Sequence, residues 1–233
     1  QTALQSYNQL AWFDGVGDYI TCGANTFSMA TFTASLWFNG SDVEGSNSRP
    51  LLTFGDSNTV HFMMQTYDQE IQFSYENSAT VVRNQSNGLD LFDNEKWYNL
   101  VVSNSSGTLT WYVNGEVVTV ATSQSNTPES CGDLFEIGRN DNKSKYFEGA
   151  ITEVAIFSTA LSQAEVNELF NDGKALDATT HSTQSGNLQG YWRNGGLSTW
   201  SNLDNPGTLD GTPTSLTETM LIPAGVDATR DNQ

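Results

Sequence analysis

Residues 31–38 read Thr-Phe-Thr-Ala-Ser-Leu-Trp-Phe, and this stretch decides the fold class. Every second residue from Phe32 to Phe38 is apolar, and Trp37 lies among the polar residues between them. Successive side chains of a β-strand point to opposite faces, so a period of two predicts a strand with one face in a core. The stretch therefore predicts a half-buried strand with Trp37 on its polar face.

More strands follow at short spacing. Alternating apolar residues mark segments near 60–65 and 71–75, and a hairpin with arms 97–103 and 108–114. Asn114-Gly115 is a strong signal for a two-residue hairpin turn. Many short strands separated by turn signals predict an all-β fold, an antiparallel two-sheet jelly-roll sandwich.

One helix interrupts the pattern, near residues 162–172. Ser162 can cap it, with Glu165 three residues later as the reciprocal partner. An apolar stripe of Val166, Leu169 and Phe170 predicts docking on a core. Gly173 suits the left-handed position that follows a helix.

The charge balance excludes some partners. The chain has 233 residues with 27 acidic and 9 basic side chains, a formal net charge of −18. Such a chain repels phosphate backbones and anionic headgroups, so we expect neither nucleic-acid binding nor membrane attachment. No segment approaches the roughly 20 apolar residues of a membrane span. Twelve Phe, eight Tyr and six Trp are enough to build a real core.

Three stretches in order resemble the LamG-like, concanavalin A-like jelly-roll family. Residues 13–20 are similar to the opening strand of the family, and residues 96–115 to its "W-x-x-V…Y-V-(D/N)-G" hairpin. Residues 147–162 resemble its "G-x-I-(D/E)-(D/E)-V…A-L-S" segment, with Thr152 in place of the usual acid. Gly190-Tyr191-Trp192 is similar to a late family strand. We therefore expect one sandwich domain over 1–219, with an N-terminal arm (1–12) and an extended tail (220–233).

The tail also resembles tails on LamG-like proteins of marine bacteriophages, in residues 221–231. This resemblance implies a non-enzymatic structural module at the virion surface, as a capsid decoration, fibre or tail component. Its partners would be capsid or tail proteins of the same particle, further copies of itself, and glycans of the host surface. The alternatives are a secreted bacterial carbohydrate-binding or adhesion module outside the cell, and a glycoside hydrolase of the same fold.

Carboxylate spacing argues against the hydrolase. Glycoside hydrolases need two carboxylates that converge on the scissile bond. Asp68 and Glu70 lie in a turn with no third acid in phase, and Glu148 and Glu153 would face opposite ways on a regular strand. His61 within a strand and His181 in a polar loop have no Gly-x-Ser-x-Gly partner. We expect no catalytic residues, and His181 exposed to solvent.

Sugar binding needs an aromatic face with polar groups around it. The alternation puts such side chains on polar strand faces, where they could line a shallow outer groove: Trp37, His61, Tyr67 and Tyr112. The alternative is that long loops or a second subunit cover these faces. The other tryptophans (12, 97, 111, 192 and 200) lie beside alternating apolar positions and indicate burial.

Calcium is the one cation that the composition suits, although no cofactor is required. LamG-like domains often hold calcium at a rim of the sandwich, and Ca²⁺ takes oxygen ligands from loops. The candidate ligands are Asp14, Asp18, Asp42, Glu44, Asp141 and Asn142. The alternative is that each pair belongs to a solvated turn. Cys22 and Cys131 could form a disulfide or stay two buried thiols, which spacing alone does not decide.

Overall fold

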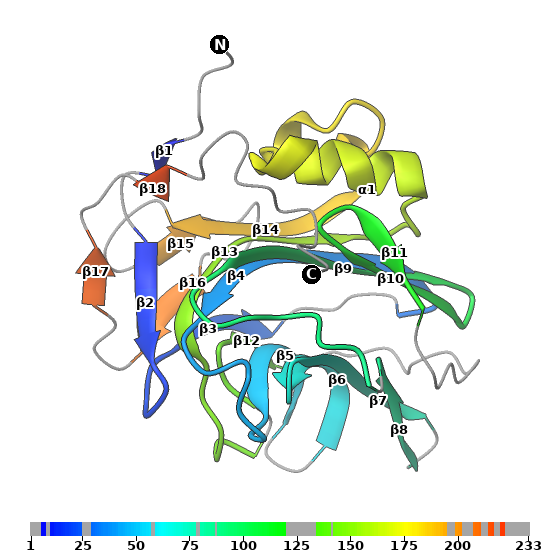
Figure 1. The fold of residues 1–233 in the computed structure, drawn as a ribbon. Helices are drawn as coiled ribbons and strands as arrows, with labels where there is room; N and C mark the ends of the chain where they lie inside the picture. Colours follow the sequence, from blue (N-terminus) through cyan, green and yellow to red (C-terminus); the bar gives the residue numbers. More distant parts are fainter. Residues whose placement is uncertain are drawn as a thin grey trace.

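The computed structural model describes residues 6–7, 10–24, 29–56, 59–77, 80–86, 88–119, 134–140, 142–194, 199–201, 207–210, 214–216 and 220–221. Their strands form two antiparallel layers packed face to face, and a helix lies outside the first layer (Figure 1). The predicted two-sheet sandwich with one short helix is confirmed. No helix among these residues is long and apolar enough to cross a membrane.

The first sheet is built around β13 and β4. Its strands in hydrogen-bonded order are β11 (Glu116–Val118), β10 (Thr108–Val113), β9 (Trp97–Ser105), β4 (Thr31–Gly40), β13 (Glu148–Phe157) and β14 (Leu188–Asn194). β2 (Leu10–Asp14) shares the outer edge of β13 with β14 and pairs in turn with β17 (Thr214–Leu216). The predicted hairpin is present as β9–β10, and the Asn114-Gly115 turn that joins β10 to β11 has both residues left-handed.

The second sheet faces the first across the core. Its order is β16 (Gly207–Asp210), β3 (Tyr19–Ala24), β12 (Leu134–Ile137), β5 (Arg49–Asp56), β6 (Thr59–Tyr67), β7 (Glu70–Asn77) and β8 (Thr80–Gln85). β15 (Thr199–Ser201) pairs with β14 and β16 and so joins the two sheets at one side.

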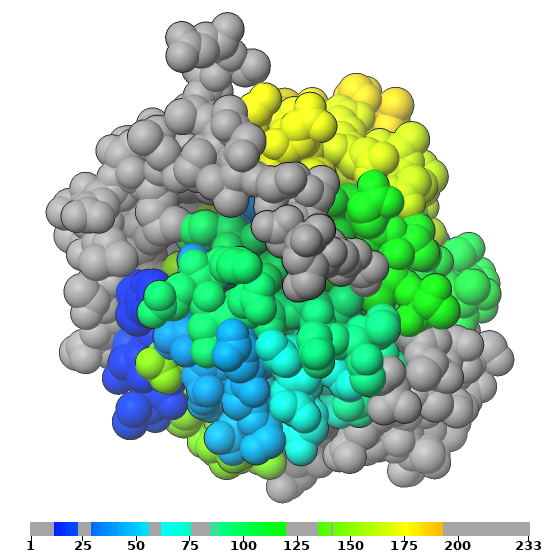
Figure 2. All heavy atoms as spheres, in the orientation of Figure 1, coloured from blue at the N-terminus to red at the C-terminus, as the bar shows by residue number. Residues whose placement is uncertain are grey.

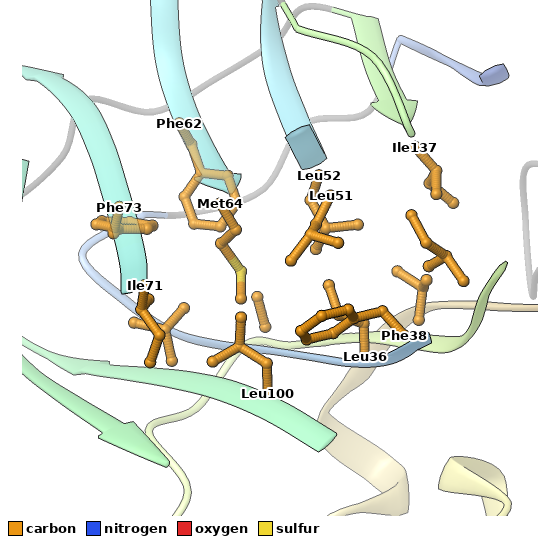
Figure 3. Close-up of a cluster of buried hydrophobic side chains, with 14 of the residues drawn as sticks. Leu36, Phe38, Leu51, Leu52, Phe62, Met64, Ile71, Phe73, Leu100 and Ile137 are labelled. Carbon is orange, nitrogen blue, oxygen red and sulfur yellow. The ribbon is translucent and has the colours of Figure 1, made fainter. Parts of the chain in front are cut away.

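The core lies between the sheets and is rich in aromatic residues. Leu36, Phe38 and Leu100 of the first sheet point toward Phe62 and Met64 of the second (Figure 3). All five are fully buried. Each is apolar and alternates with a polar or outward residue along its strand, so the period of two explains which face of each strand packs.

Helix α1 (Gln163–Phe170) begins where the sequence predicts. The Glu165 carboxylate accepts the Ser162 backbone N–H at 2.8 Å and its hydroxyl at 2.7 Å. The end differs: Asn171, two residues before Gly173, is the first left-handed residue after the helix. Because asparagine tolerates this conformation, the chain turns early into the 3₁₀ turns η1 (Asn171–Gly173), η2 (Ala178–Thr180) and η3 (Ser185–Asn187).

Two short strands from the first and last parts of the described chain pair with each other. β1 (Ser6–Tyr7) pairs with β18 (Met220–Leu221) as a separate two-stranded ribbon. The predicted N-terminal arm (1–12) therefore contains β1 and the first residues of β2. The predicted tail (220–233) begins with β18, which is paired with β1. The rest of the tail, 222–233, lies outside the described residues.

Candidate functional site on the outer face of the second sheet

The outer face of the first sheet is closed by α1 and the segment after it. Val166 and Leu169 of the helix are buried against Val101, Phe157 and Tyr191 of the sheet. Figure 2 shows the helical segment (yellow) on the outside of the molecule at this side. The described helices all belong to 163–187, which packs on this sheet, so this outer face is covered.

This cover corrects the groove predicted at Trp37 and Tyr112. Both lie on outward strand faces as predicted, but they are only 2% and 4% exposed. Tyr112 belongs to the cluster beneath α1, and the Trp37 ring stacks on Phe170 at 5.7 Å between centroids. Helix α1 and its last residue Phe170, rather than long loops or a second subunit, cover these two residues. Neither ring face is open to a sugar.

Buried polar contacts hold the cover in place. His181 is 1% exposed, which corrects its predicted exposure. Its Nδ1 accepts the backbone N–H groups of Thr183 and Gln184, each at 3.3 Å, and its Nε2 lies 3.2 Å from the Glu165 carbonyl. Burial alone would raise the pKa of Glu165, but hydrogen bonds from Ser162, Gln184 and Thr183 lower that pKa to about 2.

The outer face of the second sheet is polar instead. Cross-strand registers place Thr21, Glu136, Thr53, Met63 and Ser74 opposite one another in one row over β3, β12, β5, β6 and β7. Each alternates with a residue of the core, so the row faces away from it. Four of the five side chains are polar, but Glu136, Thr53, Met63 and Ser74 are buried. The partly exposed side chains of this face lie toward its ends: Tyr19, Thr21, Tyr67, Gln72 and Gln85.

One end of this face carries an aromatic and basic cluster. The Arg139 guanidinium lies 3.3 Å from the centroid of the Tyr19 ring, and its Nε donates to Glu136 at 3.0 Å. Burial works to lower the pKa of Arg139, but the hydrogen bond and charge of Glu136 raise it. Tyr146 pairs with Arg139 across a β-bridge, and its ring lies 6.4 Å from that of Tyr19. Tyr19 and Tyr146 are partly exposed.

The other end carries a ladder of amides. Gln65, Gln72 and Gln85 lie side by side on β6, β7 and β8, and each is hydrogen-bonded to the next. Gln85 and the backbone N–H of Gly88 both donate to the Glu70 carboxylate. The ladder thus presents fixed amide donors and acceptors, with Gln72 and Gln85 partly exposed.

The predicted glycan residues divide between the two faces. Tyr67 is partly exposed, and it follows Gln65 by two residues on β6, so it belongs to the polar face with the ladder. His61 also lies on β6, but its side chain lies outside the described residues. The structure therefore brings Tyr67 to the amide ladder and separates it from Trp37 and Tyr112.

The candidate calcium ligands do not gather. Asp14 Oδ1 accepts the backbone N–H groups of Val16 at 2.8 Å and Gly17 at 3.0 Å, and these bonds lower its pKa. Asp18 is buried and accepts the Asp14 N–H at 3.2 Å. These two acids are therefore used to hold the opening turn.

The remaining candidates also bind protein groups. Asp42 pairs with Arg49, Glu44 accepts the Asn94 N–H at 3.1 Å, and Asn142 accepts the Ser144 N–H at 3.2 Å. Asp141 lies outside the described residues. Within the part of the chain that the structure describes, no three His, Cys, Asp or Glu side chains form a group that could hold a metal.

The acids weighed for catalysis do not converge either. Glu70 is engaged by the amide ladder, and Asp68 is exposed in the tight turn before it. A β-bulge at Glu153 shifts the register of β13 against β4, so the alternation that set Glu148 and Glu153 on opposite faces does not hold. Tyr191 on the outer side of the sheet donates to Glu153. Four residues of strand still lie between Glu148 and Glu153, which puts their Cα atoms on the order of 15 Å apart.

Cys22 is buried in the core on β3, whereas Cys131 lies outside the described residues. A bridge between them stays a prediction. Burial is predicted for five tryptophans. Trp111 and Trp192 are buried as predicted, whereas Trp12 and Trp97 are partly exposed. The side chain of Trp200 is not described.

Sequence reasoning missed most of the polar face. Tyr19, Glu136, Arg139 and Tyr146 come from three separate segments that only the pairing of β3 with β12 and the 139–146 bridge bring together. Alternation alone could have placed Gln65 on the same face as Tyr67, since the two residues are two positions apart on one strand.

A model of the Concanavalin A-like lectin/glucanases superfamily matches residues 14–167. Among curated proteins, none is detectably similar in sequence. A candidate carbohydrate-binding protein from Bacteroides ovatus is similar in structure at 15% identity and a TM-score of 0.65, covering 94% of this chain and 63% of that one. A heptameric SAP-like pentraxin from Limulus polyphemus has 11% identity and a TM-score of 0.57, covering 89% and 93%.

The LG4-5 domains of the mouse laminin α1 chain are similar at 16% identity and a TM-score of 0.50, covering 69% of this chain and 45% of that one. The chain thus spans less than two thirds of the Bacteroides and laminin structures. At these identities the likeness shows the fold alone.

Proposed function

Since the chain belongs to the Concanavalin A-like lectin/glucanases superfamily, we propose that it is a non-catalytic carbohydrate-binding module. The carrying observation is the polar outer face of the second sheet, where the Tyr19–Arg139–Tyr146 cluster and the glutamine ladder lie on one surface. The similarity to a candidate carbohydrate-binding protein supports the same proposal.

The chemistry of this face suits a sugar. A pyranose offers a C–H face that packs on an aromatic ring and hydroxyls that both donate and accept. Strands β12, β5 and β6 lie between the two clusters, so a saccharide of several rings would use both. The partly exposed rings of Tyr19 and Tyr146 supply the contact for the C–H face of one ring, and Gln72 and Gln85 supply paired amides for the hydroxyls of another. The Arg139 guanidinium, which is ion-paired with Glu136, packs on one side of the Tyr19 ring and holds it in place. A preorganised surface of this kind lowers the entropic cost of binding.

The same contacts argue against hydrolysis at this face. Glu136 is held by Arg139 and Glu70 by Gln85 and Gly88, so neither of these carboxylates is placed as a free acid or nucleophile. Incubating the protein with each glycan it binds and analysing the products by mass spectrometry tests this. Release of shorter sugars would favour the hydrolase alternative.

Substitution of Tyr146 tests the binding proposal. Tyr146→Ala removes the ring and should weaken binding on a glycan array and in calorimetry about tenfold, the value of one lost aromatic contact. Tyr146→Phe keeps the ring and should bind as the wild type does. Equal affinity of the wild type and Tyr146→Ala for every bound glycan would refute the site. Repeating the titration in a chelator tests calcium dependence.

A second proposal is display on a bacteriophage particle, with the virion surface or the extracellular space as its location. It is supported by the resemblance of residues 221–231 to the C-terminal tails of LamG-like proteins of marine bacteriophages, and by the β1–β18 ribbon, which pairs residues 6–7 with residues 220–221. A chain deleted for 222–233 should then be missing from purified particles while folding normally. If the shortened chain were incorporated into particles at the wild-type level, docking through the tail would be refuted and the adhesion-module alternative would remain.

A further inference from the structure

Three buried polar atoms without hydrogen-bond partners surround Trp37 on the covered face of the first sheet. They are Asn99 Oδ1, Thr152 Oγ1 and Trp97 Nε1. Asn99 and Thr152 lie directly opposite Trp37 on the two neighbouring strands, and Trp97 precedes Asn99 by two residues on the same face. Most buried polar groups in proteins are paired, so three unpaired ones around a single ring need an explanation.

The chain lying over these atoms is a short segment rather than the body of the helix. Phe170 ends α1 with its ring parallel to that of Trp37, at an interplanar angle of 11°. Ala175 is fully buried against Trp37. This lid, defined as residues 170–176, is held at its far end by the Leu176 N–H on the Leu169 carbonyl at 3.0 Å.

The backbone of the lid is under strain. Asn171, Asp172 and Ala175 all have φ near +50°, and Gly173 has φ +80°. Asparagine and glycine tolerate the left-handed region, but Ala175 is disfavoured there because of its Cβ. A segment that combines strain with few backbone hydrogen bonds is a candidate for local opening.

We propose that the lid opens to expose a second binding platform, made by Trp37 with Asn99, Thr152 and Trp97, for an uncharged polyhydroxylated ring. Phe170 occupies the ring face that the ligand would take. The free atoms are one N–H donor, one carbonyl acceptor and one hydroxyl. Sugar hydroxyls both donate and accept, so one saccharide can satisfy all three at once. None of the three atoms carries a charge, which favours a neutral sugar over a sulfated or uronic one.

The opening is tested first in the wild type by amide hydrogen exchange. The Lys174 and Leu176 amides of the lid should exchange at least tenfold faster than the Asn114 amide, which bonds to the Asn99 carbonyl in the sheet below. Equal, slow exchange at all three positions would mean that the lid opens only with global unfolding, and would overturn the proposal.

The platform is tested by removing the ring that covers it. Phe170→Ala should raise the affinity for uncharged array glycans roughly two- to tenfold, because the stacked pair no longer holds the lid closed. Adding Trp37→Ala should abolish that gain. If Phe170→Ala and the double variant Phe170→Ala/Trp37→Ala gave the same array profile, the proposal would be overturned. Phe170→Leu, which keeps an apolar contact, serves if the alanine variant does not fold.

This test separates the platform from the face on the second sheet. The gain should persist when Phe170→Ala is combined with Tyr146→Ala, since the two faces lie on opposite sides of the sandwich. Loss of wild-type binding by Tyr146→Ala with no gain from Phe170→Ala would support the proposed function and refute the second platform. A gain in affinity from Phe170→Ala, with no effect of Tyr146→Ala, would support the second platform and refute the binding face on the second sheet.

Discussion

Gly149→Ala should be among the most damaging single substitutions in this chain. Gly149 lies on β13 opposite Gly40 of β4, with φ at +131°, a conformation that only glycine adopts readily. A Cβ built there would lie 2.1 Å from the Asn39 carbonyl oxygen and 2.8 Å from the Gly40 Cα. Both are backbone atoms of a central strand, so no side chain can turn aside to make room.

The cost follows from two contributions. A non-glycine residue in this region costs about 1–3 kcal/mol, and overpacking that forces a backbone shift costs about 1–3 kcal/mol more. We therefore expect a loss of roughly 2–6 kcal/mol of unfolding free energy. For a chain of this size that lowers the melting temperature by about 5–20 °C.

Urea denaturation followed by tryptophan fluorescence, with calorimetry, measures the loss. Gly17→Ala is the matched control: a Cβ there meets nothing within 4 Å, so its midpoint should stay within about 0.5 kcal/mol of the wild type. If Gly149→Ala unfolded at the same midpoint as the control, the reasoning about the β13–β4 contact would be refuted.

Two other perturbations address the site and its cover. Glu136→Gln should destabilise the fold by about 3 kcal/mol, because it leaves the buried Arg139 charge without its partner, and the urea midpoint measures this loss. An unchanged midpoint would mean that the pair adds nothing. Because the folded pKa of Glu165 is about 2, below its unfolded value, its contribution to stability is complete above about pH 4.5 and falls as the pH drops toward 2. Glu165→Gln should flatten that part of the stability–pH profile, and a profile as steep as that of the wild type would contradict the assignment.

The fold was predictable because its signals are local. Alternation from Phe32 to Phe38, the Asn114-Gly115 turn and the Ser162–Glu165 cap each depend on residues a few positions apart. The structure contains each of them, and the family match covers the same stretches. The end of the helix was less predictable, since Asn171, Asp172 and Gly173 are all left-handed and no local signal shows that the helix ends at the first of them.

The site was less predictable because it depends on long-range pairing. Alternation correctly puts Trp37 outward, but no local signal shows that Phe170, more than 130 residues later, will stack on it. Arg139 and Tyr19 meet for the same kind of reason, through the β3–β12 register. The bulge at Glu153 is an irregularity of one residue that reverses the face of a side chain, and periodicity cannot reveal it.

The central claim is that the second sheet presents the sugar-binding face, and backbone NMR tests it most directly. The protein would be titrated with the uncharged glycan that binds best on the array. The largest amide shift changes should fall at Tyr19, Thr21 and Gln72, partly exposed residues on the outer face of that sheet. Changes confined to α1, at Ala164 and Glu168, with the second sheet unmoved, would contradict the account.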